Sequence, residues 1–361
     1  MHSIADDADV RLPPVKLRIG MLGPISHPIP PPSYGPWERV TYELVEGLEE
    51  LGHEVTLFAP EGTTTSASRL VTTCPHSLDL GGMDARLWEE RHIAIAMEAA
   101  HSEAFDVVHS HLHVHALGYS RLLPCPMINT LHGVAWNSAH HPILEAYREQ
   151  PFVSISDSER RFQPRLNYLA TVYNGIRVDD FPVRTSSGSY LVFVGRLAPE
   201  KAADLAIAVA IRSGRKLVMA GVVEAQHRQF FAAEIEPAIA EGHAEYVGSL
   251  TRSELASLMI DSAGLLMPLR WDEPFGLVVT EALACGTPVI AWRRGAMPEI
   301  IRDGETGFLV DNVDQAVAAV GRLDEIDPLA CRHHVEQNFS RQTMAAGYAM
   351  AYRAALDRFV S

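Results

Sequence analysis

Short apolar runs alternate with longer amphipathic segments along most of the chain. Residues 15–22 form the first apolar run, and in the segment that follows, residues 37–52, apolar side chains recur every three to four positions. Such runs predict strands, and such a period predicts a helix with one buried face. Further strands are predicted in two series, at residues 53–59, 105–110, 126–133 and 151–156, and at residues 190–195, 215–221, 244–249, 263–269 and 287–292.

The alternation of strands with helices of ten or more residues indicates parallel sheets joined by crossover helices. The two series are separated by residues 173–190, whose Gly, Pro and Ser content is typical of a linker. We therefore predict an α/β protein with two Rossmann-like, doubly wound parallel-sheet domains that face a central cleft. The expected divisions are a disordered tail (1–15), an N-terminal domain (16–180), a C-terminal domain (181–340) and a last helix (341–361).

Charge, hydropathy and cysteine spacing argue against several classes of protein. The 361 residues carry a formal net charge of −15, which argues against a nucleic-acid or anionic-membrane surface, because such surfaces need clustered cations. No apolar run approaches the roughly 18 residues of a membrane span, and the first 14 residues are too acidic and polar for a signal peptide. The four cysteines show no CxxC spacing. We expect a reduced, cytoplasmic protein without a zinc framework.

One candidate site directly follows a predicted strand, where ligands of open α/β sheets bind. There Glu273 precedes a predicted helix, and Glu281 lies about five residues into it, or roughly 7.5 Å along the helix axis. Each carboxylate can accept hydrogen bonds from vicinal hydroxyls, and the free N–H groups at Gly276 and Leu277 can face an anion. The pattern favours a ligand with two hydroxylated rings joined by a diphosphate. The plainer alternative is that Glu273 is an acidic residue favoured by the dipole at the helix N-terminus and that Glu281 is a solvated glutamate in the middle of the helix.

A second candidate pair follows the strand predicted at residues 190–195. Arg196 comes directly after that strand, and Pro199 is well placed to begin a helix, so that Lys201 falls in its first turn. A cation there opposes the helix dipole unless an anion binds nearby. Lys201 is also one of only three lysines in the chain. Arg196 and Lys201 together can neutralise a diphosphate, and two ordinary surface cations are the alternative.

These two motifs, with the stretches around them, resemble the GT4 family of retaining glycosyltransferases, which have the GT-B fold. EPFGLVVTEALACGTPVIA and VGRLAPEK carry most of the resemblance, and GLEELGHEVTLFAP, FDVVHSH, NTLHG, SISDSE and VYNGI extend it along the chain. The family implies transfer of a hexosyl group from a nucleoside-diphosphate sugar to a hydroxyl of a saccharide, lipid or small metabolite. It also implies retention of configuration, no required metal, no cofactor, an acceptor-binding N-terminal domain, a donor-binding C-terminal domain and a last helix that crosses back to the N-terminal domain.

The resemblance implies roles for individual residues. Arg196 and Lys201 would bind the donor diphosphate, and Glu281 would bind the ribose hydroxyls. Glu273 would hold the transferred sugar, and His132 would lie beside the reacting sugar, so these two are the implied catalytic residues. The implied donor-binding set is Gly35, Arg196, Lys201, Leu250, Phe275, Gly276, Leu277 and Glu281.

Three features depart from the pattern of the family. Pro36 stands near the start of the first helix, where the family often has a second glycine, and this leaves the backbone N–H groups of Gly35 and Trp37 to approach the donor. Ala202 replaces the glycine that usually follows the lysine. The proline-rich residues 24–34 are a candidate lid. These departures bear on the contacts of the donor sugar more than on the class of reaction.

Four histidines occur at every second position: His109, His111, His113 and His115. A continuous strand would place all four imidazoles on one face, as a metal site requires. The strand is expected to end near His109 and a helix to follow, in which His111 and His115 share a face and His113 does not. The histidines have three alternative interpretations: they are metal ligands, they are loop histidines with local hydrogen-bond partners, or His111 or His113 contacts the acceptor. Trp136 is a further acceptor-side candidate, with a plain exposed loop as its alternative.

Other functions predict different residues. The one DxD-like acidic cluster, residues 6–9, lies in the tail, so phosphate neutralisation is expected to rest on cations and helix N-termini rather than on a divalent metal. A nucleotide-sugar epimerase of the same architecture and a non-catalytic nucleotide-sugar binding protein are the alternative functions. A nicotinamide dehydrogenase is disfavoured, because residues 23–37 contain no GxGxxG.

Overall fold

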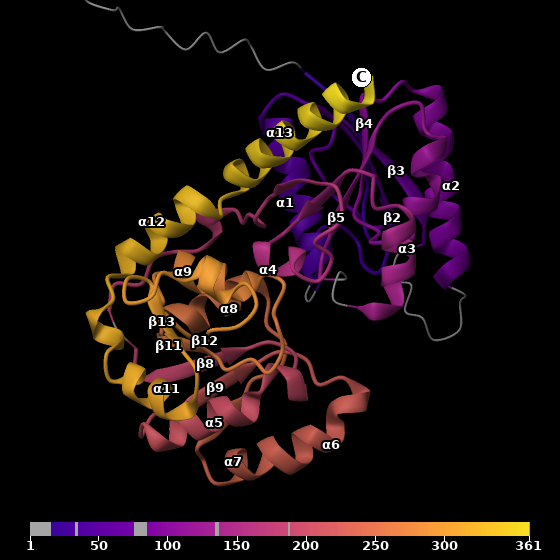
Figure 1. The fold of residues 1–361 in the computed structure, drawn as a ribbon. Helices are drawn as coiled ribbons and strands as arrows, with labels where there is room; N and C mark the ends of the chain where they lie inside the picture. Colours follow the sequence, from indigo (N-terminus) through magenta and orange to yellow (C-terminus); the bar gives the residue numbers. More distant parts are fainter. Residues whose placement is uncertain (1–15, 33–34, 76–84, 134–136, 187, 361) are drawn as a thin grey trace, which may run out of the picture.

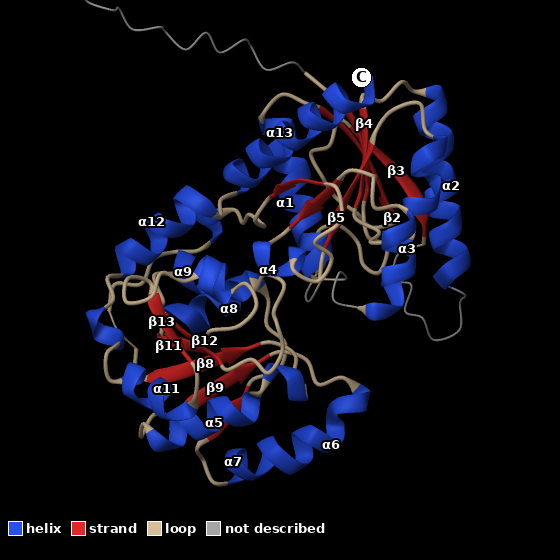
Figure 2. Ribbon diagram, in the orientation of Figure 1, coloured by secondary structure: helices blue, strands red, loops and turns tan. Residues whose placement is uncertain are grey.

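The computed structural model describes residues 16–32, 35–75, 85–133, 137–186 and 188–360, and it has two lobes (Figure 1). Each lobe is built on one parallel sheet with helices on both sides (Figure 2). The predicted fold class is therefore confirmed. The predicted tail, Trp136 and two residues of the proline-rich stretch lie outside the described residues.

Seven parallel strands form the sheet of the N-terminal lobe in the order β3-β2-β1-β4-β5-β6-β7. Its central strands are buried on both faces, as in other doubly wound sheets, and Ile19, Val107 and Ile128 are completely buried there. The strands are β1 (Arg18–Leu22), β2 (Glu54–Pro60), β3 (Arg69–Cys74), β4 (Val107–Ser110), β5 (Met127–Leu131), β6 (Phe152–Ser154) and β7 (Tyr168–Thr171).

Six parallel strands form the sheet of the C-terminal lobe in the order β10-β9-β8-β11-β12-β13. Every residue of the central strand β11 is buried, which explains its unbroken run of apolar and small side chains. The strands are β8 (Tyr190–Val194), β9 (Leu217–Ala220), β10 (Ala244–Tyr246), β11 (Ser262–Met267), β12 (Val289–Trp292) and β13 (Gly307–Val310).

The helices connect and cover these strands, and several begin with a local cap. Thr251 and Glu254 form a capping box at the start of α8, and Ser156 accepts a hydrogen bond from Glu159 N at the start of α4. The helices are α1 (Pro36–Glu50), α2 (Ala85–Ser102), α3 (His141–Ala146), α4 (Asp157–Arg160), α5 (Ala203–Arg212), α6 (Arg228–Phe230), α7 (Glu236–Ala240), α8 (Arg252–Ile260), α9 (Leu277–Ala284), α10 (Met297–Ile300), α11 (Val313–Val320), α12 (Pro328–Asn338) and α13 (Arg341–Val360).

The last helix belongs to the N-terminal lobe in space. It leaves the C-terminal lobe after α12 and runs along α1, as the yellow ribbon in Figure 1 shows. Tyr348 and Tyr352 are completely buried in the core that also contains Ile19, Leu44 and Val107. The chain therefore passes between the lobes twice, once before β8 and once before α13.

Three local predictions differ from the structure. The edge strands β3, β7 and β13 were not predicted; β3 and β7 are half exposed, so their apolar pattern is weak. The helix expected at Pro199 is only a 3₁₀ turn, and α5 begins at Ala203, after Ala202 in a left-handed conformation with φ 60°. Lys201 therefore precedes the helix rather than lying in its first turn.

The prediction of a helix after His109 is also wrong. After β4 the chain makes turns and then a 3₁₀ helix at Leu117–Leu122. Ser110 Oγ accepts a hydrogen bond from Leu112 N, and His113 adopts a left-handed conformation with φ 55°, which interrupts any helical repeat. The predicted pairing of His111 with His115 on one helical face is thereby lost.

Candidate active site

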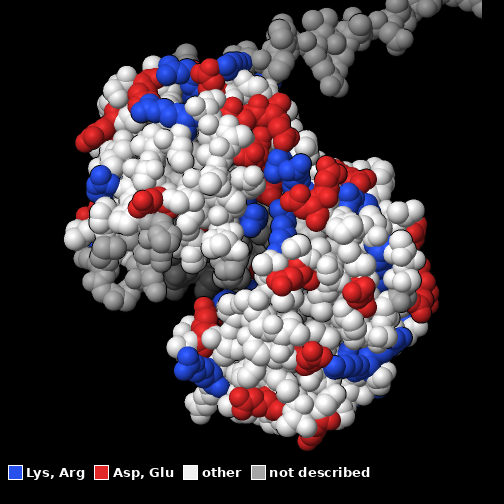
Figure 3. Space-filling view, turned by 180° about the vertical axis from the view of Figure 1, so that it is seen from behind, with Lys and Arg blue, Asp and Glu red and all other residues white. Residues whose placement is uncertain are grey.

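A pocket lies in the cleft between the lobes, and Figure 3 shows basic side chains in this hollow. One wall is formed by the residues that follow β8, β9, β10 and β11, and the opposite wall by the start of α1. The position beyond the carboxyl ends of parallel strands is the usual one for a ligand. The lining includes Gly35, Pro36, Arg39, Gly195, Arg196, Lys201, Gly221, Leu250, Arg252, Glu273, Gly276, Leu277 and Glu281.

Most of the predicted donor residues thus lie around one pocket, and Phe275 does not line it. Its side chain is buried against Tyr173 and Phe339, with ring centroids 6.2 and 5.9 Å away. Phe275 therefore anchors the EPFG turn in the core of the C-terminal lobe. The next residue, Gly276, has φ 102° and is the N-cap of α9, so the N-terminus of that helix lies at the pocket.

Glu281 lies in the second turn of α9 and lines the pocket. Burial raises the pKa of Glu281 to about 7, while the nearby guanidinium groups of Arg252 and Arg39 act in the opposite direction. A carboxylate in such an environment gains from hydrogen-bond donors, and two vicinal hydroxyls would supply them. Glu281 is therefore a partly buried residue of the pocket rather than a fully exposed mid-helix glutamate.

Glu273 and Lys201 meet in the pocket. The Lys201 ammonium donates a hydrogen bond to the Glu273 carboxylate, and Trp271 Nε1 donates another at 3.0 Å. Lys201 also lies 4.6 Å from the centroid of the Trp271 ring. The main chain of Glu273 is fixed as well, because its carbonyl accepts a hydrogen bond of 2.8 Å from Ala296 N. Both charged groups therefore have defined positions before any ligand binds.

Arg196 follows β8 and lines the same pocket. Its guanidinium contacts Glu200 at 2.9 Å and Glu224 at 3.1 Å, so it is held by two carboxylates of its own lobe. An arginine held in this way keeps its planar guanidinium in a fixed orientation. Arg196 and Lys201 are thus two cations that line the pocket together with Glu273.

The predicted histidines form a buried group on the N-terminal lobe. His111 Nδ1 and His132 Nε2 lie 2.8 Å apart, and the ring of His113 lies 6.2 Å from that of His132. His109 is bound instead to Tyr352 and Thr130, and His115 to Glu89. The structure therefore brings His111, His113 and His132 together, and separates them from His115.

Burial keeps these imidazoles neutral. It lowers the pKa of His111 and His132 well below the ordinary value, and the pKa of His113 to about 3. Within the described part of the chain, His111 Nε2 and both ring nitrogens of His113 are buried without a hydrogen-bond partner. Among the same residues, no group of three or more His, Cys, Asp or Glu side chains could hold a metal ion.

Comparison with known proteins identifies the family to which this chain belongs. The family model described as "Glycosyltransferase Family 4" matches residues 37–179, and that described as "Glycosyl transferases group 1" matches residues 180–332. The chain belongs to the GT4 glycosyltransferases. It is 28% identical to the glycogen synthase of Mycobacterium tuberculosis over 92% of this chain and 94% of that protein.

Solved structures support the fold of this glycosyltransferase. AviGT4, a glycosyltransferase involved in avilamycin A biosynthesis, has a TM-score of 0.71 and 22% identity over 94% of this chain and 98% of that one. Anabaena HepE, solved in complex with UDP and glucose, has a TM-score of 0.70 and 16% identity over 94% of this chain and 100% of its own. No helix in the part of this chain that the structure describes is long and apolar enough to cross a membrane.

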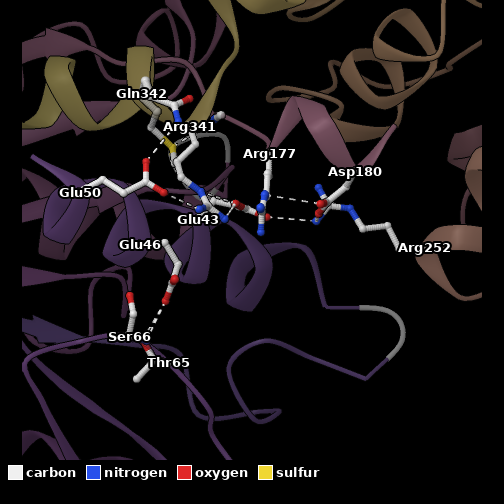
Figure 4. A network of polar contacts seen from close by, with 12 residues as sticks. Glu43, Glu46, Glu50, Thr65, Ser66, Arg177, Asp180, Arg252, Arg341 and Gln342 are labelled. Carbon is white, nitrogen blue, oxygen red and sulfur yellow. Dashed lines mark hydrogen bonds and ion pairs between the residues drawn. The ribbon is translucent and has the colours of Figure 1, made fainter. Parts of the chain in front are cut away.

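Sequence reasoning missed two cations of the glycosyltransferase pocket, Arg39 on α1 and Arg252 at the start of α8. Arg252 Nη1 donates to Glu43 of α1 at 3.1 Å and to Asp180 at 2.7 Å, and Arg341 of α13 also donates to Glu43 (Figure 4). The network therefore links the pocket to the linker, through Asp180, and to the start of α13, through Arg341. A local motif could not reveal it, since its partners are far apart in the sequence.

Proposed function

We propose that this glycosyltransferase moves a sugar from a nucleoside-diphosphate sugar to an acceptor hydroxyl with retention of configuration. The observation that carries the proposal is that Glu273, in the turn before α9, and Glu281, in the second turn of α9, line one pocket together with Arg196 and Lys201. Two carboxylates suit two hydroxylated rings, and two cations suit the diphosphate between them. HepE, solved with UDP and glucose, gives independent support for this class of donor.

The proposed contacts follow the order of the groups in the donor. Glu281 accepts hydrogen bonds from the ribose hydroxyls, and Leu250 borders the base. Arg196, Lys201 and the N–H groups at the start of α9 hold the diphosphate. Binding of the diphosphate competes for Lys201 with the Glu273 carboxylate, and this leaves that carboxylate available to the hydroxyls of the transferred sugar.

The proposed chemical step uses the leaving phosphate as the base. The acceptor hydroxyl attacks the sugar from the face that the phosphate leaves, and an oxygen of that phosphate, held by Arg196 and Lys201, takes the hydroxyl proton. The configuration is therefore retained without a protein nucleophile. Glu273 orients the sugar and stabilises the positive charge that develops at its ring. His132 approaches the sugar from the other lobe, so it acts only when the cleft is closed.

The acceptor is proposed to be a neutral polyhydroxylated molecule that binds beside His111 and His113. Both imidazoles are neutral, and a neutral imidazole can both donate and accept a hydrogen bond, as a hydroxyl does. Trp37 packs edge-on against His113 with ring centroids 4.4 Å apart and is 39% exposed, so it offers an apolar face to a sugar ring.

The deciding experiment incubates the protein with a panel of nucleotide sugars, with and without hydroxylated acceptors, and identifies the products by NMR. We expect a new glycoside with the anomeric configuration of the donor, formed only with an acceptor. An epimerised donor without acceptor would favour the epimerase, and donor binding without any turnover would favour the non-catalytic binding protein.

The reaction is proposed not to require a divalent metal, because four cationic side chains, Arg39, Arg196, Lys201 and Arg252, line the pocket. We expect transfer to continue after exhaustive EDTA treatment and removal of the chelate. Complete loss of activity that Mg²⁺ or Mn²⁺ restores would show that carboxylates of this chain hold a metal.

Removing either diphosphate cation should weaken donor binding. A hydrogen bond to a charged group contributes about 1.5–3 kcal/mol, so Arg196→Ala and Lys201→Ala should each raise the dissociation constant of a nucleoside diphosphate about 10- to 150-fold. The measurement is isothermal titration calorimetry. The matching nucleoside without phosphates is the control, because it should bind the parent protein and both variants equally. Equal weakening for the nucleoside would contradict the phosphate assignment.

A further inference from the structure

The side chain of Glu299 crosses from the C-terminal lobe to the N-terminal lobe. Its carboxylate accepts hydrogen bonds from Asp157 N at 2.7 Å, from Ser158 N at 2.8 Å and from Tyr173 OH at 3.1 Å. The two amides begin α4 of the N-terminal lobe, where a negative charge is favoured, and Tyr173 lies in the linker. One carboxylate therefore binds two amides of the N-terminal lobe and one hydroxyl of the linker.

On the N-terminal lobe, α4 is also bound to the segment that carries His132. Glu159 of α4 is 2% exposed, and its carboxylate accepts hydrogen bonds from Gly133 N and from Ile155 N. Gly133 is the residue directly after His132. A shift of α4 therefore moves the main chain that carries the His132 imidazole.

On the C-terminal lobe, Glu299 is joined to the turn that carries Glu273. Ala296 N donates to the Glu273 carbonyl at 2.8 Å, and Glu299 N donates to the Ala296 carbonyl at 2.9 Å. Gly295, with φ 59°, packs so closely that a Cβ atom there would lie 2.3 Å from Glu273 N. The main chain from Glu273 to α10 is thus a tightly packed unit that ends at Glu299.

We infer that Glu299 is a positioning residue, which sets the position of His132 relative to Glu273 across the cleft through α4 and Glu159. This inference rests on the proposed function, in which His132 and Glu273 hold the same sugar from opposite lobes. Glu299 does not line the nucleotide pocket, and the residues that do belong mainly to the C-terminal lobe. The expected consequence of losing it is slower chemistry rather than weaker donor binding.

The test is a double-mutant cycle with Glu299→Gln, His132→Ala and the double variant, measured as kcat and donor KM. A misplacement of about 1 Å can cost about 100-fold, so Glu299→Gln should lower kcat about 10- to 100-fold and change donor KM less than about 3-fold. In the His132→Ala background, Glu299→Gln should lower kcat less than about 3-fold further, because the group that it positions is absent.

Two further variants provide a second test of the inference and a matched control. Tyr173→Phe removes one of the three hydrogen bonds, so it should lower kcat less than Glu299→Gln and should also have no effect in the His132→Ala background. It also covers the case in which Glu299→Gln fails to fold. Glu325→Gln, the same substitution in an exposed ion pair with Arg322, is the matched control and should retain parental kinetics.

The outcomes separate the inference from the proposed function. Equal effects of Glu299→Gln in the parent and in the His132→Ala background would overturn the inference and leave the proposed active site intact. An unchanged kcat in Glu299→Gln and Tyr173→Phe would do the same. A His132→Ala variant with parental kcat would overturn both, and the measurement on that single variant identifies this case.

Discussion

Glu273→Gln should lower turnover about 100- to 1,000-fold, which is the usual effect of removing one preorganised electrostatic partner of a transition state. The substitution keeps the shape of the side chain, and the remaining oxygen can still accept the hydrogen bond from Trp271. It removes the negative charge that would stabilise the ring of the departing sugar. Donor affinity should change little, because Arg196 and Glu281 still hold the nucleotide. The measurement is kcat at saturating donor.

The adjacent carboxylate is the control for this variant. Asp272 is half exposed and pairs with Arg294 at the surface, so Asp272→Asn should retain parental turnover. Intact-mass spectrometry on the parent protein with donor should show no covalent glycosyl adduct. An adduct trapped on Glu273 would instead indicate a double displacement, and an unchanged turnover in Glu273→Gln would remove this residue from the chemical step.

Glu43→Gln should lower the free energy of unfolding by about 3–5 kcal/mol, the typical cost of removing one partner of a buried ion pair. The Glu43 side chain is completely buried and contacts two arginines, Arg341 and Arg252 (Figure 4). Without the charge of Glu43, the Arg341 side chain, which is 5% exposed, keeps Glu50 as its ion-pair partner within the described part of the chain. The measurement is urea-induced unfolding.

The control is Glu50→Gln, which removes a carboxylate from the same arginine. The Glu50 side chain is 47% exposed, and exposed ion pairs contribute at most about 1 kcal/mol. Added salt should reduce the small Glu50 effect and leave the Glu43 effect nearly unchanged, since buried pairs are screened less. Equal losses of stability in the two variants would show that burial does not determine the contribution of this network.

The parts of the site that lie close together in the sequence could be predicted. The Glu273–Glu281 spacing depends on one turn and one helix, so the pattern of residues 271–286 determines it. Lys201 stands out in the sequence because lysines are rare, although the α-helical turn predicted for it is absent. The central strands were predicted for a similar reason, since a strand buried on both faces consists of apolar and small residues.

The rest depends on contacts that the sequence pattern does not encode locally. Glu43 and Arg341 are 298 positions apart, and Glu299 and Asp157 are 142 positions apart. The edge strands β3 and β7 have one partner each, and their exposed side makes them resemble loops. The left-handed His113 could not be predicted either, because it depends on the packing of Trp37 and His132 around it.

The return of α13 to the N-terminal lobe also sets an order of events during synthesis. Domains usually fold as units while the chain leaves the ribosome, the N-terminal one first. Here the first domain to emerge lacks Tyr348 and Tyr352 until the second domain has been translated, although both are completely buried in its core. The apolar surface around Leu44 and Val107 that α13 covers is therefore exposed throughout that interval. The nascent N-terminal domain thus carries uncovered apolar surface, which favours aggregation, for as long as the C-terminal domain is being made.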